Sequence, residues 1–104
     1  MNSYFHCYPH LVLERISEED DSIMIFDSNS RKFFSMNSTA GTILLNCEGK
    51  TVDEIAMIVQ DRYDFPDKEN QEIRAELNDF LSSMVRNEIL YSNSSRLSQR
   101  NVNE

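Results

Sequence analysis

A chain of 104 residues is expected to fold as one domain around one hydrophobic core. Its 18 acidic residues outnumber its 10 basic residues, for a formal charge of -8, which argues against nucleic acid as a partner because phosphate backbones require a clustered positive surface. The sequence has neither an apolar window of about 18 residues, as a membrane span requires, nor the basic start of a signal peptide. A cytoplasmic protein without a membrane partner is therefore expected.

The first ten residues combine aromatics and histidines without a regular period, which predicts a mobile or loosely docked arm over 1–10. His6, Cys7 and His10 are metal-ligand types, but the absence of a fourth ligand nearby argues against a metal site. Cys47 lies far from Cys7 in the sequence and no CxxC spacing occurs, so reduced thiols are expected.

Three strands are predicted next, over 11–16, 23–27 and 32–36. Apolar residues dominate the first two, and a polar run separates them. The sequence SNSR before the third strand is typical of a turn, because Asn and Ser side chains bond nearby backbone groups. The order predicts a small antiparallel meander.

The third strand has a period of two that separates its side chains into two faces. Lys32, Phe34 and Met36 share one face, and Phe33 and Ser35 share the other. Because a helix that must cover the sheet follows Met36 directly, we assign Phe34 and Met36 to the core face.

Two helices are predicted from their end signals. Asn37 or Ser38 offers a side-chain oxygen to the unpaired N–H groups of the first helix, which ends near Gly49. Thr51 and Glu54 form a capping box at the start of the second helix, and the proline in DFPD ends it.

A third and longest helix is predicted from a cap near Asp67. Its apolar positions recur at helical spacing and predict a buried stripe of Ile73, Leu77, Phe80, Leu81, Met84 and Val85. Beyond Tyr91 the sequence becomes polar and aperiodic, which predicts a disordered tail over 92–104.

These elements predict an α+β domain over 11–91, with a three-stranded antiparallel sheet followed by three helices. The short second helix, the turn and the longer third helix also fit a winged helix-turn-helix.

Three segments in this order resemble the PqqD-like proteins, also called RiPP recognition elements. They are FDSNSRKFFSMNSTAGTIL, then EGKTVDEIA followed by RY, and then ELNDFLSSMVRNEIL. The resemblance extends from Ile23 to Leu90. Two positions depart from the family pattern: Leu44 stands where the family often has Trp, and Glu88 replaces the usual glycine before the final apolar pair.

The resemblance implies a non-catalytic protein without a cofactor that binds the leader segment of a ribosomally made precursor peptide. In this family the leader adds as a strand to the third strand and lies in the cleft against the third helix. The segment SRKFFSMNSTAG is most similar to recognition proteins of lasso-peptide pathways, whose partners are a cysteine leader peptidase and an ATP-dependent cyclase. A partner of a radical-SAM peptide-modifying enzyme is the alternative.

The strand pattern supports the same hypothesis independently. In a simple meander the strand 32–36 is an outer strand, whose unpaired N–H and C=O groups are a template for another chain. Lys32 is its only charge, which protects the edge weakly. The candidate peptide-binding residues are Lys32, Phe33, Phe34, Ser35 and Met36 on the strand and Arg74, Asn78, Leu81 and Val85 on the third helix.

Catalysis is not indicated, because no strained elbow such as GxSxG occurs, and two glycines are too few for a phosphate-binding loop. Two rival functions remain. A winged-helix DNA binder should present several cations on its third helix, whereas only Lys68, Arg74 and Arg86 lie between Asp67 and Glu88. An adaptor that oligomerises through the same strand edge would leave that edge self-paired.

Overall fold

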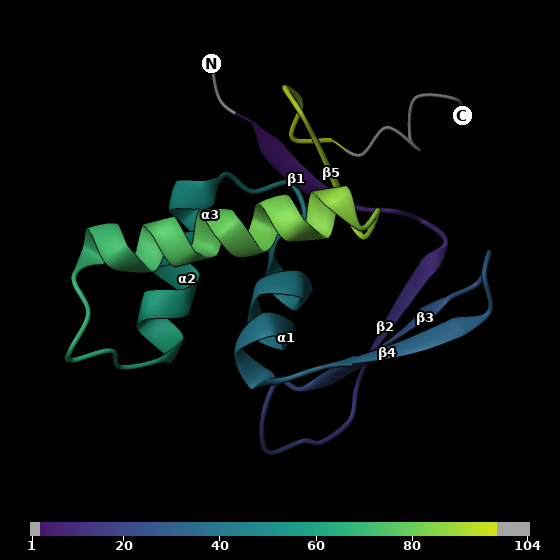
Figure 1. The fold of residues 1–104 in the computed structure, drawn as a ribbon, viewed down its shortest axis with the longest axis horizontal. Coiled ribbons are helices and arrows are strands. Elements are labelled where there is room, and N and C mark those ends of the chain that lie inside the picture. Colours follow the sequence, from purple (N-terminus) through teal and green to yellow (C-terminus); the bar gives the residue numbers. More distant parts are fainter. Residues whose placement is uncertain (1–2, 98–104) are drawn as a thin grey trace.

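The structure is a computed structural model and describes residues 3–97. Its helices and strands follow one another as β1 (Tyr4–Cys7), β2 (Leu11–Arg15), β3 (Ile23–Asp27), β4 (Lys32–Met36), α1 (Ser38–Asn46), α2 (Val52–Arg62), α3 (Asn70–Arg86) and β5 (Leu90–Asn93). In Figure 1, α1 lies between α3 and the sheet formed by β2, β3 and β4.

The predicted α+β arrangement is confirmed in its main features. Strands β2, β3 and β4 form a three-stranded antiparallel sheet in that order, and three helices follow. The register places Ile25 between Leu13 on β2 and Phe34 on β4. Ile23 and Ile25 are fully buried on the face that the helices cover.

A second sheet of two strands was not predicted. Residues 4–7, expected to belong to a loosely docked arm, form β1, which pairs antiparallel with β5. Phe5 and His6 are buried there, because β5 brings the end of α3 against the N-terminal segment. The predicted tail also begins too early, since β5 includes residues 92 and 93. Residues 98–104 of that tail lie outside the described residues.

The helix ends follow local signals in two of three cases. The side chain of Asn37 accepts a hydrogen bond from the Ala40 N–H (3.0 Å) and caps α1. Thr51 and Glu54 form the predicted capping box of α2. The third expectation is wrong: α3 does not begin near Asp67 but at Asn70, and no side chain caps it.

The C-terminal end of α3 shows how the chain accommodates Glu88. The Glu88 N–H donates to the Val85 carbonyl (3.1 Å), and the Ile89 N–H donates to the Met84 carbonyl (2.9 Å). This pattern is a Schellman motif, which requires a left-handed residue after the helix. Glu88 takes that conformation with φ 61°. A glutamate therefore adopts a backbone geometry that favours glycine.

A buried carboxylate joins the β2–β3 connection to the helices. Asp21 accepts hydrogen bonds from the hydroxyl of Thr42 (2.6 Å) and from the guanidinium groups of Arg15 (2.5 Å) and Arg62 (2.8 Å). The Thr42 hydrogen bond holds the pKa of Asp21 below its usual value, although burial opposes it. Gly41 allows the backbone of Asp21 to lie directly against α1, because a Cβ at this position would lie 1.6 Å from the Asp21 carbonyl oxygen.

Within the described part of the chain, no helix is long and apolar enough to cross a membrane.

Candidate functional site

Strand β4 lies at one edge of the three-stranded sheet. Among residues 3–97 it pairs with β3 alone. The orientation of its backbone groups follows from the hydrogen bonds between β2 and β3, because successive residues of an antiparallel strand bond to opposite sides.

The ladder between β2 and β3 identifies the residues that bond in each direction. The Ile16 N–H donates to the Ser22 carbonyl (3.0 Å), and the Ser28 N–H donates to the His10 carbonyl (3.0 Å). Even-numbered residues of β3 therefore bond to β2, and Ile23, Ile25 and Asp27 bond toward β4.

On β4 the partners of these three residues are Met36, Phe34 and Lys32. The backbone N–H and C=O groups of Phe33 and Ser35 consequently point away from the sheet. Within residues 3–97, these four groups have no hydrogen-bond partner. Side chains of the strand are also exposed, and Phe33 retains 66% of its accessible surface.

The two faces of β4 differ in what they meet. Phe34 and Met36 lie on the same face as Ile25 and Ile23, as predicted, because directly paired residues project to the same side of a sheet. Met36 packs against the core. Phe34 remains 40% exposed, since no further strand lies beyond it in the described structure.

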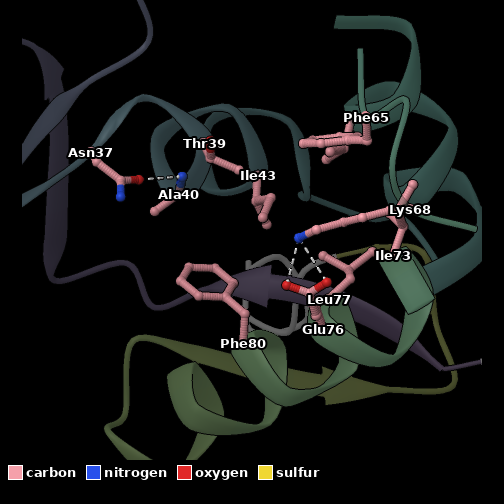
Figure 2. A pocket seen from close by; sticks show the side chains of 11 residues that line it. Asn37, Thr39, Ala40, Ile43, Phe65, Lys68, Ile73, Glu76, Leu77 and Phe80 are labelled. Carbon is pink, nitrogen blue, oxygen red and sulfur yellow. Dashed lines mark hydrogen bonds and ion pairs between the residues drawn. The ribbon is translucent and has the colours of Figure 1, made fainter. Parts of the chain in front are cut away.

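A cavity of about 260 Å³ opens beyond the end of β4, between α1 and α3. Figure 2 shows Thr39, Ala40 and Ile43 of α1 on one side and Leu77 and Phe80 of α3 on the other. The remaining lining residues are Asn37, Val59, Phe65, Lys68, Ile73 and Glu76. We call this cavity the α1–α3 groove. Its walls are mostly apolar, as in most ligand-binding pockets of proteins.

An ion pair lies at one end of the α1–α3 groove. The Lys68 Nζ lies 2.8 Å from Glu76 Oε2, and both side chains are partly exposed (Figure 2). The hydrogen bond to Glu76 raises the pKa of Lys68 above its ordinary value. The Lys68 ammonium also lies 5.8 Å from the centre of the Phe65 ring. These contacts connect the α2–α3 loop with α3 at this end of the groove.

The four candidate residues on α3 do not line the α1–α3 groove. Arg74 forms an ion pair with Asp53 near the start of α2. Asn78, Leu81 and Val85 line a different hollow, together with Phe5 of β1 and Ser92 of β5. Leu81 is a core residue with 1% exposure. The expected helical flank is therefore turned toward β1 and β5.

The face of α3 that lines the groove contains Ile73, Glu76, Leu77 and Phe80. Sequence reasoning assigned three of these to the core, and Ile73 and Leu77 are indeed buried. Phe80 is only half-buried. The available signal was the i, i+3, i+4, i+7 spacing, which places these four on one side of a helix. That spacing cannot show which element faces this side.

His6 and Cys7, on strand β1, have structural partners. His6 Nδ1 donates to Glu48 Oε2 (2.6 Å), and Nε2 donates to the Ser95 carbonyl (2.9 Å). Burial opposes the charged ring, but these hydrogen bonds outweigh it and raise the pKa of His6 above its ordinary value. Cys7 and Cys47 are free thiols in contact with each other.

No group of three or more His, Cys, Asp or Glu side chains that could hold a metal ion occurs between residues 3 and 97.

Comparison with known proteins supplies the family. Residues 22–90 match the model of "Coenzyme PQQ synthesis protein D (PqqD)". No curated protein sequence matches the chain.

Two solved structures share the fold. One is described as "TbiB1 in Complex with the TbiA(beta) Leader Peptide", with a TM-score of 0.69, 21% sequence identity and coverage of 85% of this chain and 99% of that chain. The other, "Lasso peptide synthetase B1 complexed with the leader peptide", has a TM-score of 0.66, 17% identity and coverage of 84% and 96%. The family model matches most of the chain and confirms the resemblance seen in its sequence. The chain therefore belongs to the PqqD family.

Proposed function

We propose that this protein binds the leader segment of a ribosomally synthesised precursor peptide and presents the attached core to maturation enzymes. The leader adds as a strand to the free edge of β4. The protein performs no chemistry itself. Tethering raises the local concentration of the precursor around the partner catalyst, so that a modest leader affinity yields a large gain in processing.

The observation that supports this proposal most directly is the outward-facing backbone of Phe33 and Ser35. Two N–H and two C=O groups at an exposed edge match the hydrogen-bonding needs of an extended peptide. Backbone pairing supplies affinity with little sequence preference, so selection of a particular leader requires side-chain contacts.

The α1–α3 groove supplies those contacts. Guest residues directly beside Phe34 and Met36 carry their side chains on the helix-covered side of the sheet. The groove opens on that side, next to Asn37, and offers Ile43, Leu77 and Phe80. We therefore place the specificity residues on the groove face of α3, in place of Arg74, Asn78, Leu81 and Val85.

The two structural neighbours support the same function, because both were solved with leader peptides bound. The description of the second as a lasso peptide synthetase favours a lasso-type pathway, for which we propose a leader peptidase and a cyclase as the partners. The role also implies a cytoplasmic protein, where ribosomes release the precursor.

The winged helix-turn-helix remains a proposed description of the fold. A DNA-binding function is less well supported. Of the cations on the third helix and its approach, Lys68 is paired with Glu76 and Arg74 with Asp53. A helix that binds in a groove of DNA needs unpaired Lys or Arg side chains for contacts with phosphates and base edges.

Amide NMR tests the proposal with a synthetic peptide that has the sequence of the leader of a precursor from the same biosynthetic pathway. We expect micromolar or tighter binding, shifts of the amides of residues 32–36, and slower hydrogen exchange at Phe33 and Ser35 in the complex. The amide of Phe5, already bonded to the Lys50 carbonyl (2.9 Å), is the internal control and should not change. Shifts confined to α2 and α3 would rule out strand addition at β4.

A further inference from the structure

The two cysteines of the chain, Cys7 and Cys47, lie together in the fold although they are far apart in the sequence. Cys7 ends β1, and Cys47 is the C-cap residue of α1. The Phe5 N–H donates to the Lys50 carbonyl (2.9 Å), and the Gly49 N–H donates to the Phe5 carbonyl (2.7 Å). This antiparallel bridge brings the end of α1 beside Cys7, because the two paired segments run in opposite directions.

The side chains of both cysteines face the same packed interior. Successive residues of a strand alternate between faces, so Cys7 shares the face of Phe5, which is buried in the core. Cys47 is a member of that core, and Cys7 packs against it. A turn in which the Lys50 N–H donates to the Cys47 carbonyl (3.0 Å) holds the backbone at the second cysteine. The two thiols therefore meet between β1 and α1.

The two thiols differ in their access to solvent and in their acidity. Cys7 is half-buried, whereas Cys47 has no exposed surface. A hydrogen bond from Cys47 lowers the pKa of Cys7, and burial and the Glu48 carboxylate oppose this effect without outweighing it. The same hydrogen bond, together with burial, raises the pKa of Cys47. Cys7 is therefore the thiol that a small molecule in solution meets first, and the one that more readily forms the nucleophilic thiolate.

A bond between these two cysteines would enclose the leader-binding part of the chain. The segment between them contains β2, β3, β4 and α1. A cross-link at the ends of so long a segment stabilises the folded state, mainly because it restricts the unfolded chain. Neither β4 nor the lining of the α1–α3 groove includes a cysteine. The bond would thus stabilise the sheet and leave the outer edge of β4 available.

We propose that Cys7 and Cys47 form a reversible disulfide site that exchanges with small disulfides of the glutathione type. The Cys7 thiolate attacks one sulfur of the small disulfide, and the other sulfur leaves as a thiolate that takes up the proton lost by Cys7. Cys47 then attacks the Cys7 sulfur of the mixed disulfide, and the second small thiol leaves with the proton of Cys47. Two protein thiols are oxidised, and one small disulfide is reduced to two thiols.

Both cysteines are free thiols in the structure, which is the state expected in a reducing compartment. The bond forms when small disulfides accumulate there, and it opens again when they are reduced. The inference does not depend on leader binding, because neither cysteine belongs to the leader edge or to the groove.

The test equilibrates the full-length chain with mixtures of reduced and oxidised glutathione. Mass spectrometry measures the fraction of chains that have lost two hydrogen atoms, and the same titration in urea gives the value for the unfolded chain. We expect the equilibrium constant for the intramolecular bond to be at least about tenfold larger in the folded chain, because packing holds the two thiols together. The oxidised chain should accordingly unfold at a temperature at least about 5 °C higher than the reduced chain.

Two variants identify the role of each thiol. Cys47→Ala should stop at the mixed disulfide between Cys7 and glutathione. Cys7→Ser, which changes only the half-buried residue, should leave Cys47 unmodified as long as the chain is folded, since Cys47 has no exposed surface. The titration of the wild-type chain needs neither variant and tests the proposal even if Cys47→Ala does not fold.

An equilibrium constant that is no larger in the folded chain than in urea would overturn the inference, as would covalent dimers in place of the intramolecular bond. Leader affinity, measured on the oxidised and reduced chains, should be the same. Loss of leader binding in the oxidised chain alone would overturn the separation of this site from the leader edge. Absence of leader binding in both forms would overturn the proposed function and leave the disulfide site standing.

Discussion

Strands β1 and β4 each pair with one other strand, yet the backbone groups on the second edge of the two strands differ in their hydrogen bonding. At β1, the Phe5 N–H donates to the Lys50 carbonyl (2.9 Å), and the Gly49 N–H donates to the Phe5 carbonyl (2.7 Å). The Cys7 N–H donates to the Glu48 carboxylate (3.0 Å). The connection between α1 and α2 thus occupies this edge. At β4 the corresponding groups of Phe33 and Ser35 have no partner within residues 3–97.

This difference shows that a strand edge can bind a guest strand only where no other segment of the same chain already hydrogen-bonds to it. Gly49 makes the return to β1 possible, since its φ of 69° belongs to the left-handed region. A Cβ at this position would also lie 2.8 Å from the Arg96 carbonyl oxygen. After β4, the chain instead enters α1 directly, with the Asn37 cap at the joint. The local geometry that starts a helix therefore leaves the strand edge exposed.

The largest expected effect comes from removing a backbone N–H group from the open edge of β4. Ser35→Pro removes an N–H that points away from β3, so leader affinity should fall by roughly tenfold to a hundredfold while the sheet pairing survives. Ser35→Ala is the matched control and should change affinity by less than about threefold, because the Ser35 side chain forms no hydrogen bond in the described structure. Isothermal titration with the leader peptide measures both. Equal affinities would contradict strand addition at this edge.

The second effect distinguishes the two sides of α3. Phe80→Ala removes an aromatic wall of the α1–α3 groove and should weaken leader binding by about tenfold. Val85→Ala removes a partly exposed apolar side chain from the side that faces β1 and β5, and should leave affinity unchanged. Fluorescence anisotropy of a labelled leader gives both values. The reverse order would place the guest against the other side of α3.

A smaller effect concerns the closed region around β1. The pKa of His6 is raised on folding, so its stabilisation is complete below the unfolded pKa of about 6.5 and is lost as the pH rises through the folded-state pKa. Glu48→Gln removes the carboxylate that favours the charged ring but keeps an oxygen for the Cys7 N–H. The wild type should exceed the variant in free energy of unfolding by on the order of 1 kcal/mol at about pH 6.

Urea unfolding at several pH values measures this difference, which should shrink as the pH rises above about 6.5. Leader affinity should stay the same in both proteins, because His6 and Glu48 lie on the closed edge. A difference that is independent of pH would show that the His6 charge does not contribute to stability.

The smallest expected effect concerns the turn that leads into β5. Glu88→Gly places the residue with the least steric cost at a φ of 61°, and should increase the free energy of unfolding by about 1 kcal/mol. Arg31→Gly is a parallel variant in the turn between β3 and β4, since Arg31 is the other non-glycine residue with φ 61° among residues 3–97. Thermal unfolding measures both. Destabilisation by Glu88→Gly would show that the side chain contributes more than the backbone strain costs.

Local signals predicted much of the fold correctly. The three strands between residues 11 and 36, the Asn37 cap and the Thr51–Glu54 capping box all depend on neighbouring residues, whose chemistry is visible in the sequence. The side-chain faces of β4 were predictable for the same reason, because a period of two is a property of the strand itself.

The candidate site was predictable only in part. The candidate residues 32–36 lie on an edge strand, as predicted, whereas Asn78, Leu81 and Val85 line the hollow beside β1 and β5, and Arg74 pairs with Asp53. Helical spacing groups residues into faces but does not name the neighbour of each face. That neighbour depended on β1, whose pairing with β5 joins Phe5 to Ser92 across most of the chain.

The sequence by itself thus determined which segments become strands and helices, where two helices begin, and which family the chain resembles, because these properties depend on residues close together in the chain. Tertiary structure alone decided that the edge of β1 is filled and that α3 presents Phe80 to the groove, whereas the edge of β4, predicted to be unpaired, has no partner among residues 3–97. The physical reason is that backbone hydrogen bonds and apolar faces are satisfied by whichever distant segment arrives there, and no local pattern encodes that arrival.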